Sequence, residues 1–559
     1  MKKILPYFIL PLLFLGAGCS SSAPQRSEPP VEDHTMMQHS DSSGDDAMRE
    51  HCKMMPEMRG CEKYKNDDQS SADSESPVER SVAGLSEAVN QSIVSVKNND
   101  TYSLSASFVK NTINDKTIRM LSYNGQIPGP ILRVKQGDSI KVNFKNNLDE
   151  PTTVHWHGLR LENKSDGVPG MTQPAVKPGQ SYTYNVSFPD AGLYWYHPHV
   201  REDYQQALGM YGLIWVEPNS TNYFDPVNRE EFLALNDILL NGNDVAPYDK
   251  ERVNYTLMGR FGNVMLVNGQ ERYSLNVNQG DVVRFPIVNT ASTRVFKLSI
   301  PGVKLKLIGG DSGGYKNDTW VDSVTIGPSE RVIVEAQFVK YGEYKLNHAT
   351  PSKTYTLGTI TVANTKTEHD YSKEFQTLKN RSDEFAGLNL DNYYAKPIDK
   401  EIDMTIKMPG MDHMSMSGMM HDDKNSDGIE WEDTMAMMNS MSNDKSLTWI
   451  LRDKDSGKEN HEIDYSWKKG DKVKIRLFND PNSMHPMQHV MHFHGNRFVV
   501  LSVNGVKNTN PVWKDSVLVP TGAKVDVLLD LSNPGTWMGH CHIAEHTESG
   551  MMMVYKVNE

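Results

Sequence analysis

The stretch HCHIAEHTESGMM near the end of the chain gathers side chains that bind soft metal ions. Cys541 is flanked by His540 and His542 and is followed, at intervals of five residues, by His546 and Met551. Successive side chains of an extended strand point to opposite faces, so Cys541 must face away from the two flanking histidines. A thiolate, two imidazoles and a long axial thioether make up the trigonal copper site of electron-transfer proteins. We therefore predict that this one peptide contacts two different metal sites, the first held in part by Cys541, His546 and Met551.

Pairs of histidines separated by one residue occur four times in the chain. With 19 histidines in 559 residues, chance gives roughly 0.6 of such a pair, so the pairs are a signal rather than background. Positions i and i+2 lie on the same face of a strand, which lets each pair present two imidazoles to a common cavity. The pairs are His155 with His157, His197 with His199, His492 with His494, and His540 with His542.

Length and composition set the class of protein that must position these groups. A chain of 559 residues is too long for one core and is typical of three domains of ordinary size. The 40 glycines and 29 prolines suit all-β domains with many turns. A net charge of −13 argues against a nucleic-acid partner and either favours the attraction of cations or serves solubility alone.

A short pattern recurs three times and divides the chain into domains. LRVKQGDSIKVNFKN, LNVNQGDVVRFPIVN and YSWKKGDKVKIRLFN each contain Gly-Asp, then alternating apolar residues and a closing Asn. Such repeats predict related β-sandwich units. We place the domains at 82–219, 220–366 and 367–559. The first and third carry the histidine pairs, which predicts a metal cluster at their seam, and we expect the middle domain to act as a spacer.

The first eighteen residues have the pattern of a targeting segment. Two lysines precede an apolar run and the small residues of LGAGC, which resembles a bacterial lipoprotein signal in which cleavage leaves Cys19 lipidated. An ordinary cleaved signal peptide is the alternative. We expect an exported lipoprotein of the cell envelope, tethered to a membrane through Cys19, on the periplasmic face, the outer membrane or the extracytoplasmic face of the cell membrane.

Residues 19–81 are rich in Ser, Asp, Glu, Pro and Met and poor in aromatic residues, which predicts a disordered, flexible stalk. The stalk contains several His and Met residues, so it is either a copper-loading arm or a low-complexity spacer. Cys52 and Cys61 could form a disulfide in an oxidising compartment or could bind copper.

A methionine-rich insertion spans residues 404–441 of the third domain. Thioethers favour Cu(I) over harder ions, which predicts a site for substrate copper, and a partner-binding surface is the alternative. Met487, close to His489, is a further candidate for that site. The candidates in the insertion are Met404, Met408, Met411, Met414, Met416, Met419 and Met420.

The motifs HWHG, WYHPH, HxxHxHG and HCHxxxHxxxxM, present in this order, resemble those of the multicopper oxidases, and the resemblance covers about residues 82–559. GLYWYHPHVREDY, MGRFGNVMLVNG and VDSVTIGPSERV are most similar to bacterial lipoprotein members linked to copper tolerance and ferroxidase activity. The resemblance implies an all-β fold of three cupredoxin-like Greek-key β-sandwich domains that holds four copper ions.

Carried over by position, the resemblance gives each ligand a role. His489, Cys541 and His546, with Met551 axial, would hold a type 1 copper, and His155 and His492 a type 2 copper. Asp166 and Glu545 resemble positions that deliver protons in the family, although either could be a structural carboxylate. The binuclear type 3 pair would be held by His157, His197, His199, His494, His540 and His542.

Several functions fit these ligands. The first is an oxidase of metal ions, chiefly Cu(I) and also Fe(II), that passes electrons through Cys541 to the cluster and reduces O2 to water. Copper-efflux oxidases carry an Asp shortly before the first type 1 His, whereas DPNSMHPMQH here has no carboxylate after Asp480. The alternatives are a laccase-like phenol oxidase and a lipoprotein that sequesters Cu(I) without turnover, while a two-domain nitrite reductase would lack the paired histidines. We expect a monomer.

Overall fold

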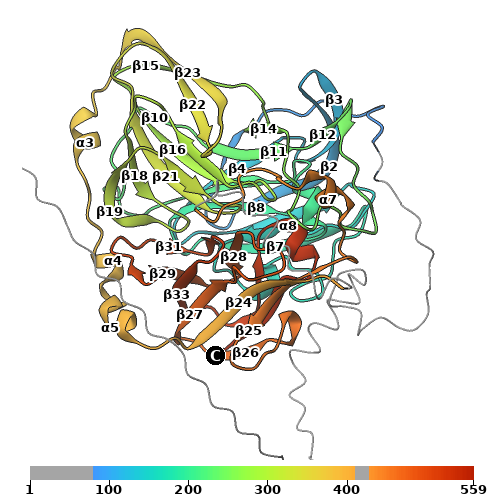
Figure 1. The fold of residues 1–559 in the computed structure, drawn as a ribbon. Coiled ribbons are helices and arrows are strands. Elements are labelled where there is room, and N and C mark those ends of the chain that lie inside the picture. The colour runs from blue at the N-terminus through green and yellow to red at the C-terminus, as the bar shows by residue number, and fades with distance from the viewer. Residues whose placement is uncertain (1–77, 79, 410–426) are drawn as a thin grey trace, which may run out of the picture. The chain divides into compact units, whose positions relative to one another are not determined.

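The structure is a computed structural model that describes residues 78, 80–409 and 427–559 (Figure 1). Within these residues the chain forms three β-sandwiches in chain order, coloured blue to teal, green to yellow, and orange to red. The expected all-β class with cupredoxin-like sandwiches is thereby confirmed. Cys19, the stalk up to residue 77 and much of the methionine-rich insertion lie outside the described residues. No helix of the described part is long and apolar enough to cross a membrane.

The first sandwich pairs a five-stranded sheet, in the order β1-β4-β9-β8-β6, with a four-stranded sheet, in the order β3-β2-β5-β7. Its core lies between these two sheets and includes the fully buried Trp156 and Tyr184. The strands are β1 (Ile93–Ser95), β2 (Thr101–Ile113), β3 (Lys116–Tyr123), β4 (Gly129–Lys135), β5 (Ser139–Asn146), β6 (His155–His157), β7 (Ser181–Ser187), β8 (Gly192–His197) and β9 (Gly212–Glu217), with short helices η2 (Asn163–Ser165) and α2 (Glu202–Gln205).

The second sandwich has a seven-stranded sheet along β14-β11-β16-β21-β18-β19, with β10 beside β16, and a five-stranded sheet in the order β15-β23-β22-β17-β20. The strands are β10 (Arg229–Glu230), β11 (Leu233–Ile238), β12 (Leu240–Asn241), β13 (Asp244–Val245), β14 (Val264–Val267), β15 (Tyr273–Gln279), β16 (Val282–Asn289), β17 (Phe296–Ser299), β18 (Leu305–Gly309), β19 (Gly314–Val321), β20 (Val324–Ile326), β21 (Arg331–Gln337), β22 (Gly342–Ala349) and β23 (Thr354–Lys366).

The third sandwich follows three short helices, α3 (Ser372–Gln376), α4 (Asp383–Ala386) and α5 (Leu390–Ala395). Its sheets run β25-β24-β27-β33-β29-β30, with β31 beside β29, and β26-β35-β34-β28-β32. Its elements are β24 (Lys400–Lys407), α7 (Ala436–Met441), β25 (Thr448–Asp453), η3 (Asn460–Glu462), β26 (Asp464–Lys468), β27 (Lys472–Asn479), β28 (His489–Phe493), β29 (Arg497–Val503), β30 (Val506–Lys507), β31 (Trp513–Lys514), β32 (Ser516–Val519), β33 (Lys524–Asp530), β34 (Gly535–Cys541), α8 (Ala544–Glu548) and β35 (Met552–Asn558).

Each of the three sequence repeats forms the same strand-turn-strand unit, which crosses from one sheet of a sandwich to the other. The units are β4–β5, β15–β16 and β26–β27. The glycine of each Gly-Asp turn has a positive φ, which favours glycine there: Gly137 (91°), Gly280 (97°) and Gly470 (93°). The closing asparagine of each repeat is buried, and its amide donates to two backbone carbonyls at 2.7–2.9 Å: Asn146, Asn289 and Asn479.

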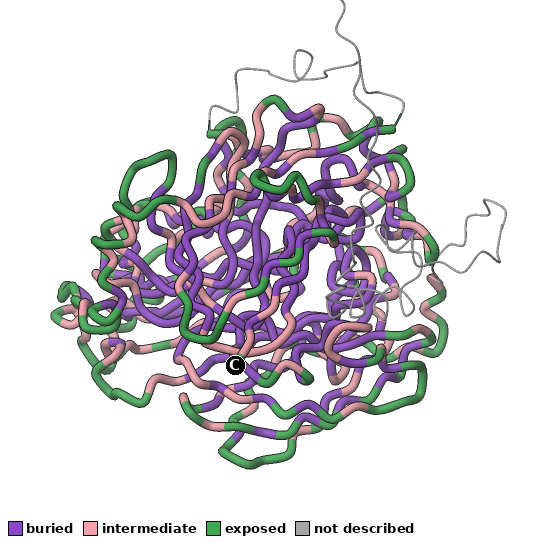
Figure 2. Tube along the Cα trace, turned by 90° about the horizontal axis from the view of Figure 1, so that it is seen from below, coloured by how far each residue is buried: buried purple, intermediate pink, exposed green. Residues whose placement is uncertain are grey.

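Burial continues from one sandwich to the next. Figure 2 shows buried backbone running through the interior, with exposed residues on the loops around it. Trp195 and Trp215 of the first sandwich share an apolar cluster with Val288 and Ile333 of the second. Removing such apolar surface from water stabilises the contact by about 25 cal/mol per Å². The first and second domains are therefore joined by a hydrophobic interface.

The methionine-rich insertion differs from its expected extent of 404–441. Met404 lies on β24 and is fully buried, and Met408 is 6% exposed; both belong to the apolar core of the third domain. The insertion therefore begins only after this strand. Its described end forms α7, on which Met437 and Met441 are exposed.

Candidate metal centre

Four strands, two from the first domain and two from the third, carry the histidine pairs. In the first domain β6 pairs antiparallel with β8, which places His155 opposite His197. In the third domain β28 pairs antiparallel with β34, which places His492 opposite His540. Each pairing brings together two histidine pairs that are distant in sequence.

The two sets of imidazoles meet across the domain boundary. The rings of His155 and His494 are 4.1 Å apart between centroids, and those of His157 and His492 stack at 3.8 Å. Ligand atoms from both domains converge within 4.8 Å in several groups of three, including the group His155, His492 and His494. The predicted cluster at the seam of the first and third domains is thus present as a geometric arrangement.

Most of these rings have one nitrogen held by an acceptor and the other without a partner. His155 Nδ1 donates to Asp166 O at 2.7 Å, and His492 Nδ1 donates to Asp515 O at 2.9 Å. Such contacts fix the tautomer of a ligand and leave the opposite lone pair for a metal ion. The buried nitrogens without a hydrogen-bond partner include His155 Nε2, His157 Nδ1, His197 Nε2, His492 Nε2 and both nitrogens of His542.

In two further rings, those of His494 and His540, the Nε2 atoms face each other. His494 Nε2 and His540 Nε2 are 3.0 Å apart, while their Nδ1 atoms contact Asp166 and the Cys541 carbonyl. Two unprotonated nitrogens at this distance have no hydrogen bond to make. Unpartnered buried nitrogens are costly, so this donor set fits transition-metal ions, copper among them, better than it fits an ordinary polar core.

A second donor set surrounds Cys541. Its Sγ lies 3.6 Å from His489 Nδ1 and 3.9 Å from His546 Nδ1, and the two nitrogens are 3.3 Å apart. Met551 is fully buried, and its carbonyl accepts a hydrogen bond from the Cys541 backbone at 3.1 Å. The ring of Trp449 stacks on His546 at 4.1 Å. A near-triangular set of one sulfur and two nitrogens matches the trigonal site predicted from the sequence.

Burial shifts the pKa of each of these donors in the direction that favours its neutral form. It lowers the pKa of His489 to about 3 and that of His540 to about 4, so both rings are neutral at pH 7. Burial also raises the pKa of the Cys541 thiol to about 12. Binding of a metal ion must therefore release the thiol proton.

The two predicted proton carriers lie in different surroundings. Asp166 is 1% exposed and accepts a hydrogen bond from His494 Nδ1 at 2.9 Å, so it contacts the cluster directly. Glu545 lies in the first turn of α8, fully buried, where it accepts a hydrogen bond from Thr293 at 3.2 Å. Burial raises the pKa of Glu545 to about 7.

Three polar residues that contact the histidines were not predicted from the sequence. Glu202 lies 3.0 Å from His199 Nδ1, and Asp515 and Ser516 lie 3.0 and 3.1 Å from His157 Nε2. Glu202 could have been found from its position three residues after the HPH motif. Asp515 and Ser516, 358 and 359 residues away along the chain, could not.

The predicted substrate methionines divide into two groups. Met404, Met408 and Met487 are buried in the core cluster that also contains Cys541 and Met551. Exposed thioethers instead occur on α7, which was not among the candidates: Met437 is 76% exposed, Met438 42% and Met441 74%. The remaining candidates, Met411, Met414, Met416, Met419 and Met420, lie outside the described residues.

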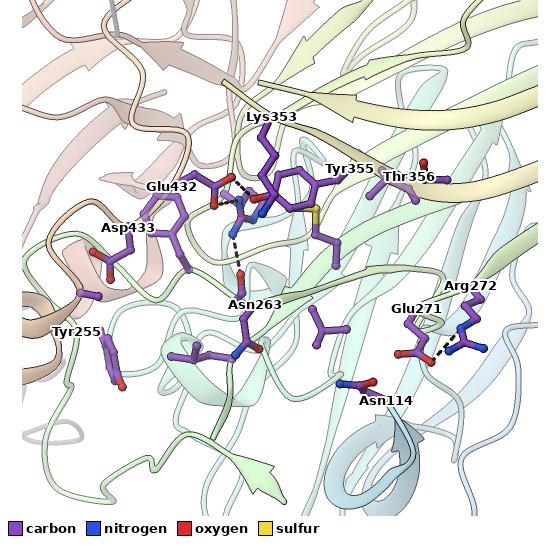
Figure 3. A pocket seen from close by; sticks show the side chains of 18 of the residues that line it. Asn114, Tyr255, Asn263, Glu271, Arg272, Lys353, Tyr355, Thr356, Glu432 and Asp433 are labelled. Atoms are coloured by element: carbon purple, nitrogen blue, oxygen red, sulfur yellow. Dashed lines mark hydrogen bonds and ion pairs between the residues drawn. The ribbon is translucent and has the colours of Figure 1, made fainter. Parts of the chain in front are cut away.

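A cavity of about 670 Å³ opens beside α7, between that helix and the second domain (Figure 3). Glu432 lies on its wall and accepts hydrogen bonds from Tyr355 and Arg294. Lys353 lies over the Tyr355 ring. None of the histidines of the metal centre lines this cavity.

Comparisons with known proteins agree with this geometry. Family models described as multicopper oxidase match residues 106–221, 227–368 and 411–559. The chain is 27% identical over 450 residues to the multicopper oxidase mco of Staphylococcus aureus, across 78% of this chain and 84% of that protein. It is 26% identical over 570 residues to copper resistance protein A of Escherichia coli, across 78% and 89%. The fold also matches the solved structure of a Campylobacter jejuni multicopper oxidase described as a metallo-oxidase, with a TM-score of 0.63 and 23% identity over 85% of this chain and 98% of that one. With three family models spanning most of its length and paired histidines at the seam of two sandwiches, this chain belongs to the multicopper oxidases.

Proposed function

We propose that the protein holds four copper ions and couples the one-electron oxidation of metal ions, Cu(I) and also Fe(II), to the four-electron reduction of O2 to water. His489, Cys541, His546 and Met551 would hold a type 1 ion. When bound, copper supplies one-electron redox chemistry and a place for dioxygen. His155 and His492 would hold a type 2 ion, and the type 3 pair would be held by His157, His197, His199, His494, His540 and His542.

One observation carries this proposal: a single peptide joins the two donor sets. Cys541 belongs to the trigonal set, and the residues on either side of it, His540 and His542, belong to the histidine cluster. Only a few covalent bonds separate the cysteine sulfur from either imidazole. A protein that stored copper without turnover would have no need to connect a thiolate site to a cluster in this way.

The exposed thioethers of α7 support a metal ion as the substrate. Asn439 on α7 donates to Gly259 O at 2.8 Å and accepts from Met258 N at 3.0 Å. Met258 packs in the core cluster of Cys541. The helix thus carries soft sulfur ligands and is anchored to a segment that packs in the same core as Cys541. His489 is 1% exposed, which favours a small reductant over a bulky phenol.

Protons must reach the cluster together with electrons. Asp166 is suited to hold a proton there because its carboxylate contacts His494 and its backbone carbonyl accepts from His155. Glu545 has its pKa raised by burial into the range where general acids work at neutral pH. We assign proton delivery to these two carboxylates.

The physiological role that we propose is copper tolerance, in line with the name of the Escherichia coli relative. Oxidation of Cu(I) outside the cytoplasm would remove its more permeant and reactive form. Oxidation of phenols is the competing activity.

Steady-state rates with Cu(I), Fe(II) and a bulky phenol, measured on one copper-loaded preparation by oxygen uptake, test the proposal. We expect the highest kcat/KM with Cu(I), and four metal ions oxidised for each O2 consumed. A higher value with the phenol would favour the laccase-like alternative. Binding of Cu(I) without oxygen uptake would favour sequestration.

Export as a lipoprotein is part of the same proposal and rests on the LGAGC string that ends at Cys19. The protein would act as a monomer tethered to the cell envelope. Changing Cys19 to Ala should move the protein from the membrane fraction to the soluble fraction. An unchanged distribution would refute the lipid anchor.

A further inference from the structure

Although the middle domain supplies none of the histidines assembled at the metal centre, one of its side chains reaches the surroundings of that centre. Arg331, the first residue of β21, is fully buried. Its two terminal nitrogens each donate to one carboxylate oxygen of Asp515 at 2.5 Å. Its Nε donates to Leu193 O of β8 at 2.9 Å. A single guanidinium therefore contacts all three domains.

Asp515, the partner of Arg331, also contacts two of the predicted copper ligands. Its Oδ1 lies 3.0 Å from His157 Nε2, and its backbone carbonyl accepts from His492 Nδ1 at 2.9 Å. Both rings therefore have their free nitrogen on the side away from Asp515, toward the cluster. The Asp515 carboxylate, together with Ser516 Oγ at 3.1 Å, therefore holds the Nε2 edge of the His157 ring.

The surroundings of this ion pair leave it little freedom. Asp311 accepts from the Arg331 backbone at 2.8 Å and from the Asp515 backbone at 3.3 Å. Gly158 of the HWHG motif has a φ of 83°, and a Cβ placed there would lie 2.3 Å from Asp515 Oδ2 and 2.8 Å from an Arg331 nitrogen. The glycine of the motif thus makes room for the pair directly after His157.

We propose that Arg331 is a positioning residue through which the middle domain fixes the orientation of His157 and His492, and so retains the copper ions of the histidine cluster. An arginine suits this role because its planar fork holds both carboxylate oxygens at once, which a lysine cannot do. The inference rests on the proposed function, because it assumes that copper occupies the cluster.

The test uses the copper-loaded protein and two variants, Arg331→Gln and Arg331→Lys. The first removes the charge, and the second keeps the charge but not the two parallel bonds. The matched control is Arg284→Gln. Arg284 is also a buried arginine of the middle domain, bound to Glu335 at 2.8 and 3.1 Å. Its other hydrogen bonds within the described residues go to Glu230 and the Asp225 carbonyl, neither of which belongs to the metal centre.

Loss of copper to a chelator and the paramagnetic resonance spectrum of the type 2 copper are measured. We expect Arg331→Gln to lose cluster copper about tenfold faster than wild type, the low end of the effect of second-layer changes on metal affinity. Its type 2 hyperfine splitting should also shift. The blue absorption of the type 1 site should decay at the wild-type rate. Arg331→Lys should lose cluster copper at a rate between those of wild type and Arg331→Gln, and Arg284→Gln should match wild type.

An Arg331→Gln protein with wild-type copper loss and an unchanged resonance would overturn the inference. The inference would also fail if the Arg331 and Arg284 variants lost copper faster from the type 1 site and from the histidine cluster to the same extent. That pattern would report general destabilisation of the protein. If Arg331→Gln fails to fold, Arg331→Lys decides by the same two readouts. A wild-type protein that takes up fewer than four coppers, or consumes no O2, would refute the proposed function itself, whereas a loaded, active wild type with insensitive Arg331 variants would refute only this inference.

Discussion

Asp166 of the first domain and His494 of the third are joined by a buried hydrogen bond of 2.9 Å. The carboxylate therefore lies where it can both orient a ligand and hold a proton. We expect Asp166→Ala to lower kcat for Cu(I) oxidation by about 10–100-fold, because both functions are removed together. KM for Cu(I) and the blue absorption should change little. Stopped-flow spectra and oxygen uptake measure these quantities.

Glu162, an exposed carboxylate of the same loop that accepts from Asn185 at 2.8 Å, provides the control for Asp166. Glu162→Gln should leave kcat unchanged. Equal losses in the two variants would mean that Asp166 acts only through the fold of the loop.

Replacement of Cys541 by Ser should abolish the intense blue absorption and steady-state turnover. The hydroxyl is a harder and far less acidic donor than the thiol, so it cannot complete the trigonal set. The histidines of the cluster do not depend on the Cys541 side chain, so copper bound there should remain. Optical spectra with a copper count check this, and a blue, active variant would contradict the assignment of Cys541.

Conversion of Met437, Met438 and Met441 to Leu should raise KM for Cu(I) several-fold and leave the rate with Fe(II) nearly unchanged. Thioethers select the softer ion, and leucine keeps the apolar volume of α7. Met404→Leu is the control, because Met404 is fully buried in the core and should not alter KM. An unchanged KM in the triple variant would remove the support that α7 gives to a cuprous substrate.

The pH dependence of stability should include a contribution from His348 of the middle domain. Its Nδ1 accepts from the Lys297 backbone at 3.0 Å, and burial lowers its pKa to about 4. Because this value is below the unfolded value of about 6.5, the neutral ring stabilises the fold above pH 6.5, and this contribution is lost as the pH falls toward 4. The free energy of unfolding lost in this way between neutral pH and pH 5 is about 2 kcal/mol.

His348→Asn keeps a neutral acceptor. The stability of this variant, measured by thermal unfolding, should therefore fall less between pH 7.5 and pH 5 than that of the wild type. The comparison of the two pH profiles removes the contribution of every other group. Parallel profiles would show that His348 does not titrate in this range.

The candidate metal ligands could be picked out from the sequence because metal binding restricts the residue type and strand geometry restricts the spacing. A thiolate between two histidines, as at Cys541, has few other uses. The groups that orient these ligands are less restricted, since a backbone carbonyl such as that of Asp166 or a distant carboxylate such as Asp515 can serve. Arg331 lies in a domain without histidine pairs, so no local pattern connected it to the metal centre.

The start of the methionine-rich insertion is marked by periodicity and not by composition. Within EIDMTIKM the apolar side chains Ile402, Met404 and Ile406 alternate with polar ones, and all three are buried on β24. That period of two is the signal of a half-buried strand, and it was available in the sequence. A start at residue 404, as predicted from the methionine content, is therefore too early, because Met404 still belongs to β24.

The order of the ligands along the chain has a consequence for how the enzyme matures. Only four of the ten histidines precede residue 489, and the thiolate and its neighbours come within the last twenty residues. A nascent polypeptide, or one truncated shortly before its end, therefore has no complete binding site of either kind. Neither site can be completed before the segment from His540 to Met551 has been synthesised, so the full set of metal ions can be bound only late in synthesis.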